Sequence, residues 1–279
     1  MRIGLVQMTT GLNPDANARH LAAAIGELAA DGATLVFTPE MSGLLDRDSH
    51  RLRAAARDEA EDPVLAAVRD AAKRHGVGVV LGSLAVRGGA HGRLSNRSFV
   101  IGSDGVVAAR YDKLHLFDVE LAGGERYRES ASFAPGNRAE VAEVAGARLG
   151  LSICYDLRFP ALYTALAQAG ADLLAVPAAF TVPTGRAHWE VLLRARAIET
   201  GCFVAAAAQT GRHEDGRETW GHSLVVDPWG DVLLDMGVAP GVATVDLELA
   251  RVADARTRIP ALASARPFAP PAPPRDAAA

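Results

Sequence analysis

The sequence is poor in the residue types that mark several classes of protein. Only two of its 279 residues are cysteine and they lie far apart, so neither a disulfide framework nor a CxxC metal knuckle can be built. A net charge of −4, with basic residues spread along the chain, argues against a nucleic-acid-binding surface. No apolar run approaches the roughly eighteen residues that span a bilayer. The opening MRIGLVQMTTGLNPD turns polar too soon for a signal peptide. We therefore expect a soluble cytoplasmic protein with no metal, nucleic acid or membrane partner.

What the sequence does contain is enough apolar material for a large core, because hydrophobic residues make up 49% of it. Short β-type runs alternate with helical ones, in the order strand–helix–strand–helix–strand–hairpin, and the order then recurs. Strands are predicted at 3–8, 34–39, 78–86, 139–144, 147–153, 172–180, 202–209 and 243–249. Helices are predicted at 15–32, 62–75, 161–170 and 185–201, and hairpins at 98–113 and 222–236. This order predicts an α/β fold with two sheets between helix layers.

Two parts of the chain fall outside this pattern. The polar stretch 114–138 has neither period, and a loop of that length is usually functional or disordered. The end of the chain, 266–279, is rich in proline and alanine. We predict one domain over 1–265 and a tail over 266–279, either disordered or lying on a partner subunit.

The stretch GLSICYDLRFP, residues 150–160, holds one of the two cysteines. A free cysteine is usually a small buried hydrophobe, and Cys202 in GCFVAAAA fits that description. Cys154, in contrast, ends an apolar strand and faces the start of a helix. Open α/β sheets gather their ligands at such strand ends, and a helix N-terminus favours the thiolate. Cys154 is therefore a candidate nucleophile.

Two further polar residues follow apolar strands, Glu40 after TLVFTP and Lys113 after VVAARYD. Singly, each has an ordinary structural explanation, as a charge at a helix start or a solvated lysine. With Cys154 they offer a base, a cation for an oxyanion and a nucleophile, the parts that covalent acyl transfer requires. A non-catalytic binding protein is the alternative. No strand leads into GxGxxG or GxxxxGK[ST], so no nucleotide cofactor is expected.

Five motifs carry a family resemblance. They are FTPE (37–40), YDKLHLFDVE (111–120), GLSICYDLRFP (150–160), PTGRAHWEVLLRARAIET (183–200) and GHSLVVDPWG (221–230). With these motifs in order, the chain resembles the nitrilase superfamily of carbon–nitrogen hydrolases over nearly its whole length. The resemblance implies a single-domain four-layer α-β-β-α sandwich that needs no cofactor.

The resemblance also implies roles for individual residues. Glu40 would be the general base, Cys154 would form a thioester, and Lys113 would lie beside the oxyanion with the backbone N–H of Tyr155. The family carries a second glutamate in the polar loop, and Glu129 in YRES matches its place. Glu120 and Glu125 are the competing assignments.

Substrate contacts are predicted beside the nucleophile. Arg158 could hold a substrate carboxylate through two hydrogen bonds, although a surface ion pair is an equal alternative. Phe180, Thr181 and Thr184 follow the strand end where the acyl group should lie. The competing Cys–His chemistry would use one of three histidines in polar motifs as the base. These are His115, His188 and His222.

The resemblance is strongest to the Nit-type amidases that hydrolyse deaminated glutathione. It implies a thiol amidase for a small carboxylate-bearing amide, with an omega-amidase on α-ketoglutaramate-type acids or an N-carbamoyl amino acid hydrolase as alternatives. It also favours a homodimer. The apolar residues between Arg158 and Gln168 repeat at helical spacing, and they need cover from either the domain body or a second subunit.

Overall fold

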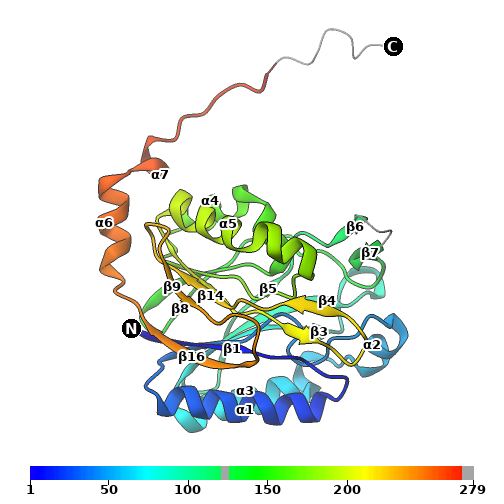
Figure 1. The fold of residues 1–279 in the computed structure, drawn as a ribbon. Coiled ribbons are helices and arrows are strands. Elements are labelled where there is room, and N and C mark those ends of the chain that lie inside the picture. Colours follow the sequence, from blue (N-terminus) through cyan, green and yellow to red (C-terminus); the bar gives the residue numbers. More distant parts are fainter. Residues whose placement is uncertain (121–125, 272–279) are drawn as a thin grey trace, which may run out of the picture.

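The computed structural model describes residues 1–120 and 126–271 (Figure 1). Within these residues the main strands form two six-stranded sheets. The first has the order β16-β1-β2-β3-β4-β5, with β16 (Gly241–Asp246), β1 (Arg2–Gln7), β2 (Leu35–Phe37), β3 (Gly78–Val86), β4 (Ser95–Ile101) and β5 (Val107–Asp112). The second has the order β15-β14-β11-β10-β9-β8, with β15 (Val232–Asp235), β14 (Leu224–Val226), β11 (Phe203–Ala206), β10 (Leu173–Ala175), β9 (Ala147–Leu151) and β8 (Val141–Val144).

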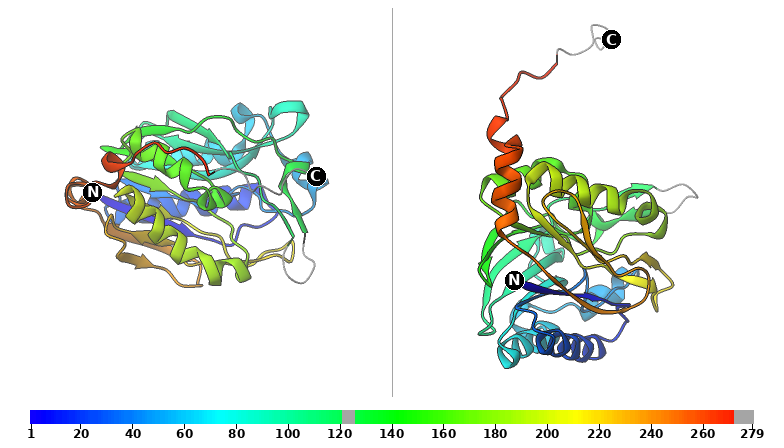
Figure 2. Two further views of the ribbon diagram at one scale, coloured as in Figure 1. Left: turned by 90° about the horizontal axis from the view of Figure 1, so that it is seen from above. Right: turned by 60° about the vertical axis from the view of Figure 1, so that its left-hand side comes forward.

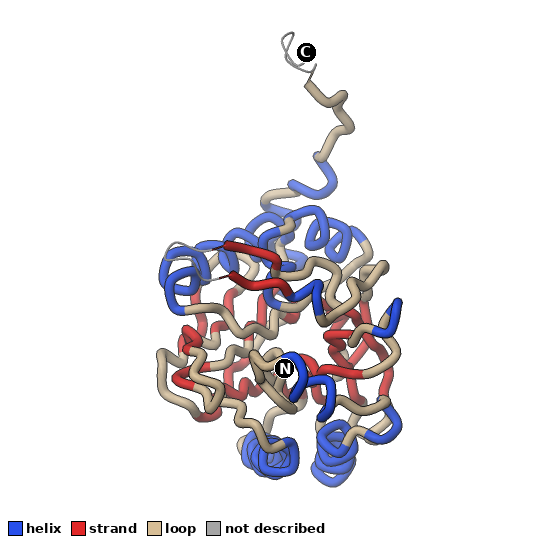
Figure 3. Tube along the Cα trace, turned by 90° about the vertical axis from the view of Figure 1, so that its right-hand side faces the viewer, coloured by secondary structure: helices blue, strands red, loops and turns tan. Residues whose placement is uncertain are grey.

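Helices cover the outer face of each sheet, so the molecule has four layers (Figures 1 and 3). On one side lie α1 (Pro14–Ala30) and α3 (Pro63–His75), and on the other α4 (Pro160–Gln168) and α5 (Val182–Thr200). The predicted single-domain α-β-β-α sandwich is confirmed.

Strand periodicity divides the core between these layers. In β1, Ile3 and Leu5 face the second sheet and pack in one cluster with residues such as Leu149 of β9. Val6 points the other way and packs against α1 and α3. Successive side chains of a strand alternate between its faces, so one short strand serves both interfaces. Packing on both faces holds each sheet in place. The residues that directly follow the strands therefore have well-defined positions.

The first layer of helices begins and ends with standard sequence signals. Asn13 caps α1 through its side chain, and Asp62 caps α3 in the same way, each followed by a proline in the first turn. The α3 helix ends at Gly76 in the left-handed region, with φ 64°. These signals lie in the sequence itself, which is why the predicted bounds of both helices agree closely with the structure.

Several short elements went unpredicted. The polar stretch 114–138 contains the small sheet β6 (Asp118–Glu120) and β7 (Arg126–Arg128), followed by the 3-10 helix η3 (Glu129–Ala131). Other such elements are α2 (Ser49–Ala55), η1 (Glu59–Glu61), η2 (Ala90–Gly92), β12 (Thr210–Arg212), β13 (Glu218–Trp220), α6 (Ala250–Arg258) and α7 (Ala261–Ser264). They are short and polar, so packing rather than periodicity defines them. Figure 2 shows α6 along the edge of the sheets and α7 above it, next to the layer of α4 and α5, with the chain after Ser264 leading away. Residues 272–279 of the predicted tail lie outside the described residues.

The apolar stripe of α4 is covered by the domain body. Leu162, Tyr163 and Leu166 are 7%, 0% and 1% exposed within the single chain. The domain body, rather than a second subunit, therefore covers these three residues. Phe159, the first apolar residue of the repeat, is only partly buried.

Candidate active site

A cavity of about 540 Å³ opens where strands of both sheets end. Glu40 follows β2, Lys113 follows β5 and Cys154 follows β9, and all three side chains line the cavity. The structure thus brings together the three residues that the sequence singled out at strand ends.

The turn after β2 positions Glu40 through a close approach to β3. The Thr38 N–H donates to Val80 O at 3.0 Å, and the Gly82 N–H donates to Thr38 Oγ1 at 3.0 Å. A Cβ on Gly82 would lie 2.1 Å from Thr38 O, so only glycine lets the backbones come this close. Met41, directly after Glu40, has a φ of 56°. The turn that carries Glu40 therefore depends on a glycine and holds a strained residue.

Three donors fix the Glu40 carboxylate, which is 5% exposed. Lys113 Nζ donates to Oε1 at 2.8 Å, Asn96 Nδ2 donates to Oε1 at 3.0 Å, and the Ala179 N–H donates to Oε2 at 3.0 Å. Burial raises the pKa of Glu40, but the charge and hydrogen bonds of Lys113 and the other donors outweigh it, and the net pKa is lowered. The carboxylate is held ionised.

Lys113 is 2% exposed and lies between two carboxylates. Its Nζ donates to Glu40 and also to Glu129, with Nζ–Oε1 3.1 Å and Nζ–Oε2 2.9 Å for the latter. Burial lowers the pKa of Lys113, but the negative charges of Glu129 and Glu40 outweigh it and leave the pKa well above its ordinary value. The site therefore holds a permanent cation beside Cys154.

Cys154 begins the 3-10 helix η4 (Cys154–Arg158) with a φ of 51°. Its backbone N–H donates to Pro177 O at 2.9 Å, which ties the turn to the end of β10. The Glu40 carboxylate is the charged group that acts most strongly on the thiol. Burial and the adjacent Glu40 carboxylate raise the pKa of the thiol well above its ordinary value, and Lys113 opposes them in part. In the resting structure Cys154 is therefore a neutral thiol beside an ionised carboxylate.

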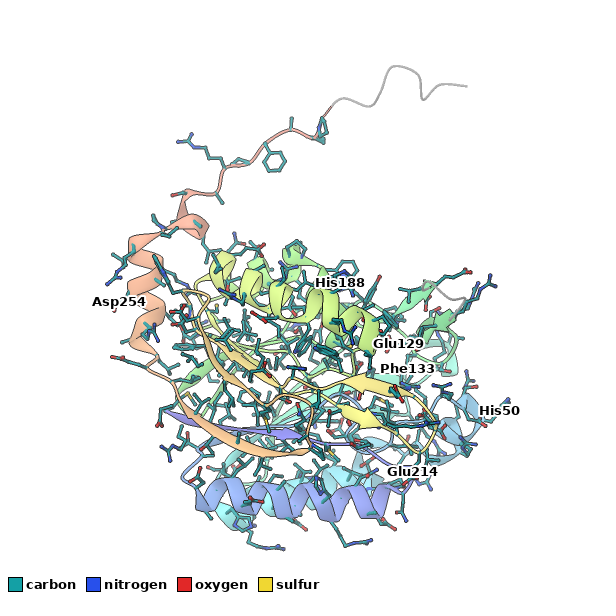
Figure 4. All side chains as sticks on the ribbon, in the orientation of Figure 1. His50, Glu129, Phe133, His188, Glu214 and Asp254 are labelled. Atoms are coloured by element: carbon teal, nitrogen blue, oxygen red, sulfur yellow. The ribbon has the colours of Figure 1, made fainter. Side chains whose placement is uncertain are left out.

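The three glutamates proposed for the second acidic position separate in the structure. Glu129 contacts Lys113 and lines the cavity, where Figure 4 shows it at the same end of the molecule as Phe133, another lining residue. Glu120 instead pairs with Arg126 at 3.0 Å on the exposed β6–β7 hairpin. Glu125 lies outside the described residues.

Each histidine considered as a base has a different partner. His115 Nδ1 lies 2.7 Å from Asp156 Oδ1, His188 Nδ1 lies 3.3 Å from Arg158 Nη1, and His222 Nδ1 lies 3.0 Å from Asp235 Oδ1. The charged group that acts most strongly on the Cys154 thiol is the Glu40 carboxylate, not a histidine. The geometry therefore favours carboxylate–thiol chemistry over a Cys–His pair.

Asp156 supports the nucleophile turn, a role that sequence reasoning missed. It is 0% exposed and accepts hydrogen bonds from the Tyr111 hydroxyl at 2.7 Å and from the Ile153 N–H at 2.9 Å. It also accepts from the His115 N–H at 3.0 Å. This carboxylate joins the loop after Lys113 to the turn of Cys154. Its place two residues after the cysteine was the available signal.

The predicted substrate contacts all line the same cavity. Tyr155, Phe180, Thr181 and Thr184 surround its inner part, and Thr181 Oγ1 lies 2.8 Å from Thr184 Oγ1. The backbone N–H of Tyr155 has no hydrogen-bond partner among the described residues.

The Arg158 guanidinium lies against two aromatic rings rather than a carboxylate. Its Cζ is 5.5 Å from the ring centroid of Phe180 and 5.9 Å from that of Tyr155. Within the described part of the chain, Arg158 forms no ion pair. The surface ion pair considered for this residue is therefore not what the structure contains.

Other arginines line the outer cavity. Arg128 has no ion-pair partner within residues 1–120 and 126–271. Arg47 and Arg217 share one carboxylate, with Nε to Asp215 Oδ2 distances of 3.9 and 3.4 Å. Asp46 and Glu218 also line this part of the cavity, so Arg47 and Arg217 lie among acidic groups.

The described residues form neither a metal cluster nor a membrane-spanning helix. No group of three or more histidine, cysteine, aspartate or glutamate side chains there is arranged to hold a metal ion. None of the helices described is both long and apolar enough to cross a membrane.

Comparisons with known proteins agree with this geometry. The model of the family described as carbon-nitrogen hydrolase matches residues 2–257. A Yersinia enterocolitica protein named deaminated glutathione amidase is 40% identical over 262 residues, which cover 93% of this chain and 91% of that protein. The human protein of the same name is 39% identical over 270 residues, covering 95% and 82% respectively.

Solved structures give the same result. The C. elegans NitFhit protein superimposes with a TM-score of 0.87 and 36% identity, over 95% of this chain. This chain covers 65% of NitFhit, slightly under two thirds of it. An amidase from Nesterenkonia sp. AN1, with acrylamide added at its active-site cysteine, has a TM-score of 0.77 and 31% identity over 93% of this chain and 98% of its own.

The chain belongs to the carbon-nitrogen hydrolase family, within the nitrilase superfamily. It is accordingly an enzyme that hydrolyses a carbon–nitrogen bond, and its amidase-named relatives make it an amide hydrolase.

Proposed function

We propose that this enzyme cleaves a small amide bearing carboxylate groups, with deaminated glutathione as the leading substrate, through a thioester on Cys154. The observation that carries the chemistry is the Cys154–Glu40–Lys113 cluster at the inner end of the cavity. The choice of substrate is supported by relatives named deaminated glutathione amidase at about 40% identity and by the arginines of the cavity.

In the first half-reaction, Glu40 takes the proton of the Cys154 thiol as the sulfur attacks the amide carbonyl carbon. The oxyanion that develops is stabilised by Lys113 and by the unpaired backbone N–H of Tyr155. The carbon–nitrogen bond then breaks, and Glu40 returns the proton to the leaving nitrogen. An amine or ammonia departs and the acyl group remains as a thioester.

In the second half-reaction, Glu40 takes a proton from water, which attacks the thioester carbonyl. The carbon–sulfur bond breaks, the carboxylic acid leaves, and the proton returns to the Cys154 sulfur. Glu129 contacts only Lys113 and Asn96 among the polar side chains of the inner site, so its proposed part is to orient Lys113 and the substrate.

Charge in the cavity supports a carboxylate-bearing substrate. Arg158 lies beside the nucleophile without a carboxylate partner among the described residues, so its guanidinium is available to the acyl portion. Arg128, which lines the cavity and has no ion-pair partner among the described residues, is available to a second anionic group. A substrate with carboxylates on both sides of the scissile bond uses both.

The test is the release of ammonia or amine from a panel of compounds. The panel contains deaminated glutathione, α-ketoglutaramate, succinamate, an N-carbamoyl amino acid and a nitrile, each with wild type and Glu40→Gln. We expect the highest kcat/KM on deaminated glutathione and no turnover with Glu40→Gln. Preference for α-ketoglutaramate or the carbamoyl compound would transfer the assignment to an omega-amidase or a carbamoyl hydrolase. No turnover on any compound would support a binding protein.

We also propose a homodimer located in the cytoplasm. The family resemblance favours a dimer, and two apolar residues of α5, Val191 and Ile198, are 69% and 55% exposed. Free thiols at both cysteines fit a reducing compartment. Light scattering at micromolar concentration should give twice the chain mass, and a monomer mass would refute the dimer.

The division into a domain over 1–265 and a tail over 266–279 also remains a proposal. Truncation after residue 265 tests it, because the shortened chain should retain activity.

A further inference from the structure

The side chain of Asn96 lies between the two glutamates of the cavity. Asn96 belongs to β4 and is 2% exposed. Its Nδ2 donates to Glu40 Oε1 at 3.0 Å and to Glu129 Oε1 at 3.1 Å, and its backbone carbonyl accepts from the Lys113 N–H at 3.0 Å. One uncharged residue therefore contacts all three charged residues of the inner site.

The orientation of the Asn96 amide follows from this network. Turned over, its Oδ1 would face two carboxylate oxygens, and an acceptor cannot bond to an ionised carboxylate. In the orientation observed, Oδ1 is buried and has no hydrogen-bond partner within the described part of the chain. Buried polar atoms are normally paired, so each exception requires an explanation. Here the two bonds made by Nδ2 explain why Oδ1 is left unpaired.

The charges around Glu40 show what those two bonds supply. The titratable groups that face Glu40 are Lys113 and Cys154, with Glu129 on the other side of Lys113. Two carboxylates thus share one ammonium group, and their mutual repulsion favours protonation of one of them. A second cation would offset this repulsion but would also weaken Glu40 as a base. A neutral donor that reaches both carboxylates reduces the repulsion without adding a charge.

We propose that Asn96 is a positioning residue that holds Glu40 and Glu129 together in their ionised forms, with Glu40 oriented toward Cys154. This inference rests on the proposed role of Glu40 as the base. Burial raises the pKa of Glu40 and Lys113 lowers it most strongly, and the hydrogen bond from Asn96 lowers it further.

The test compares two replacements with a control on the same strand. Asn96→Ala removes the donor, and Asn96→Asp keeps the shape but replaces the donor with a carboxylate. Ser98→Ala is the control. This substitution also removes one buried hydrogen bond, from Ser98 Oγ to Leu81 O at 3.2 Å, but the bond does not involve the glutamates. Thermal unfolding is measured for all three variants, and kcat and KM are measured across pH with the best substrate of the panel.

We expect kcat to fall about ten- to a hundredfold in Asn96→Ala, the worth of a hydrogen bond to a charged group, with KM little changed. The acid limb of kcat/KM should move to higher pH, because Glu40 loses a donor that favours its ionised form. Asn96→Asp should lose at least as much activity, since a third carboxylate repels the other two. Ser98→Ala should resemble wild type.

A role in shape alone would give the opposite order, with Asn96→Asp close to wild type and Asn96→Ala weaker. That order, or an unmoved acid limb in both Asn96 variants, would overturn the inference. Turnover by Cys154→Ala or Glu40→Gln would instead overturn the proposed mechanism. Inactive Cys154→Ala and Glu40→Gln together with undisturbed Asn96 variants would overturn the role of Asn96 alone.

Discussion

Cys154 and Cys202 are both buried free thiols, yet their surroundings prepare them for different tasks. Cys202 is 0% exposed and directly precedes β11, and its Sγ lies 3.2 Å from Ala171 O and 3.0 Å from Arg256 Nη2. Cys154 is 8% exposed and lines the cavity from a residue with a φ of 51°. Burial raises the pKa of both thiols. Burial and a raised pKa therefore do not distinguish a nucleophile from a core residue.

The neighbours of each sulfur make the difference. Cys154 lies beside the Glu40 carboxylate, a group able to accept a proton. Cys202 faces backbone carbonyls and an arginine, which cannot act as bases at neutral pH. Cys154 also faces space that a substrate can occupy, and Cys202 lies in the core. A reactive thiol requires a base and access together.

Removing the sulfur of Cys154 gives the largest expected effect. Cys154→Ala should abolish turnover and leave the fold intact, because the covalent step is lost. Cys154→Ser should also fail, since a carboxylate is too weak a base to ionise a hydroxyl. Mass spectrometry of wild type with substrate should find the acyl adduct on Cys154. An adduct on Cys202 would show that Cys202, and not Cys154, is the nucleophile.

The next effect concerns Lys113, the cation that contacts Glu40 beside Cys154. Lys113→Ala should lower kcat by about 10²–10³, the range measured for loss of one oxyanion donor. It should also raise the pKa of Glu40, because the ammonium is the strongest influence that lowers it. As the pH is lowered, the variant should therefore lose activity at a higher pH than wild type does. A change in KM alone would show that Lys113 binds substrate rather than stabilising the oxyanion.

These contacts show why the strand-end residues were predictable. Glu40, Lys113 and Cys154 each stand where an apolar run stops, so the break in hydrophobicity marks them and the order of elements brings them together. Asn96 gives no such signal, because it lies inside β4 between serine and arginine, and only its contacts distinguish it. The bond of Asp156 to Tyr111 spans 45 positions of the chain and is equally invisible in a local pattern.

The same reasoning explains the missed elements. The helix α6, ARVADARTR, is mostly polar, and only Val252 and Ala255 of it are buried. A helix with so narrow an apolar face gives a weak periodic signal. The strands of the β12–β13 hairpin have three residues each, and their pairing becomes evident only in the structure.

A smaller effect is expected from Arg158, the proposed contact for the acyl part of the substrate. Arg158→Ala should raise KM about tenfold or more for amides with a carboxylate on the acyl side, the worth of a charge-assisted hydrogen bond. A neutral amide of similar size should be unaffected, and Arg158→Lys should recover part of the loss since it keeps the charge without the paired geometry. Equal losses on charged and neutral amides would mean that Arg158 supports Tyr155 and Phe180 by packing.

The smallest effect on activity is expected at the second cysteine. Cys202→Ala removes a buried sulfur from the core and from Arg256, which keeps hydrogen bonds to Thr200 O and Ala171 O. We expect the free energy of unfolding to fall by about 1 kcal/mol, typical of a single substitution, with kcat and KM unchanged. Urea unfolding and steady-state kinetics measure the two quantities on one preparation. A loss of kcat without a loss of stability would show that Cys202 takes part in catalysis. A neighbouring base and access to the cavity would then not be enough to explain which thiol reacts.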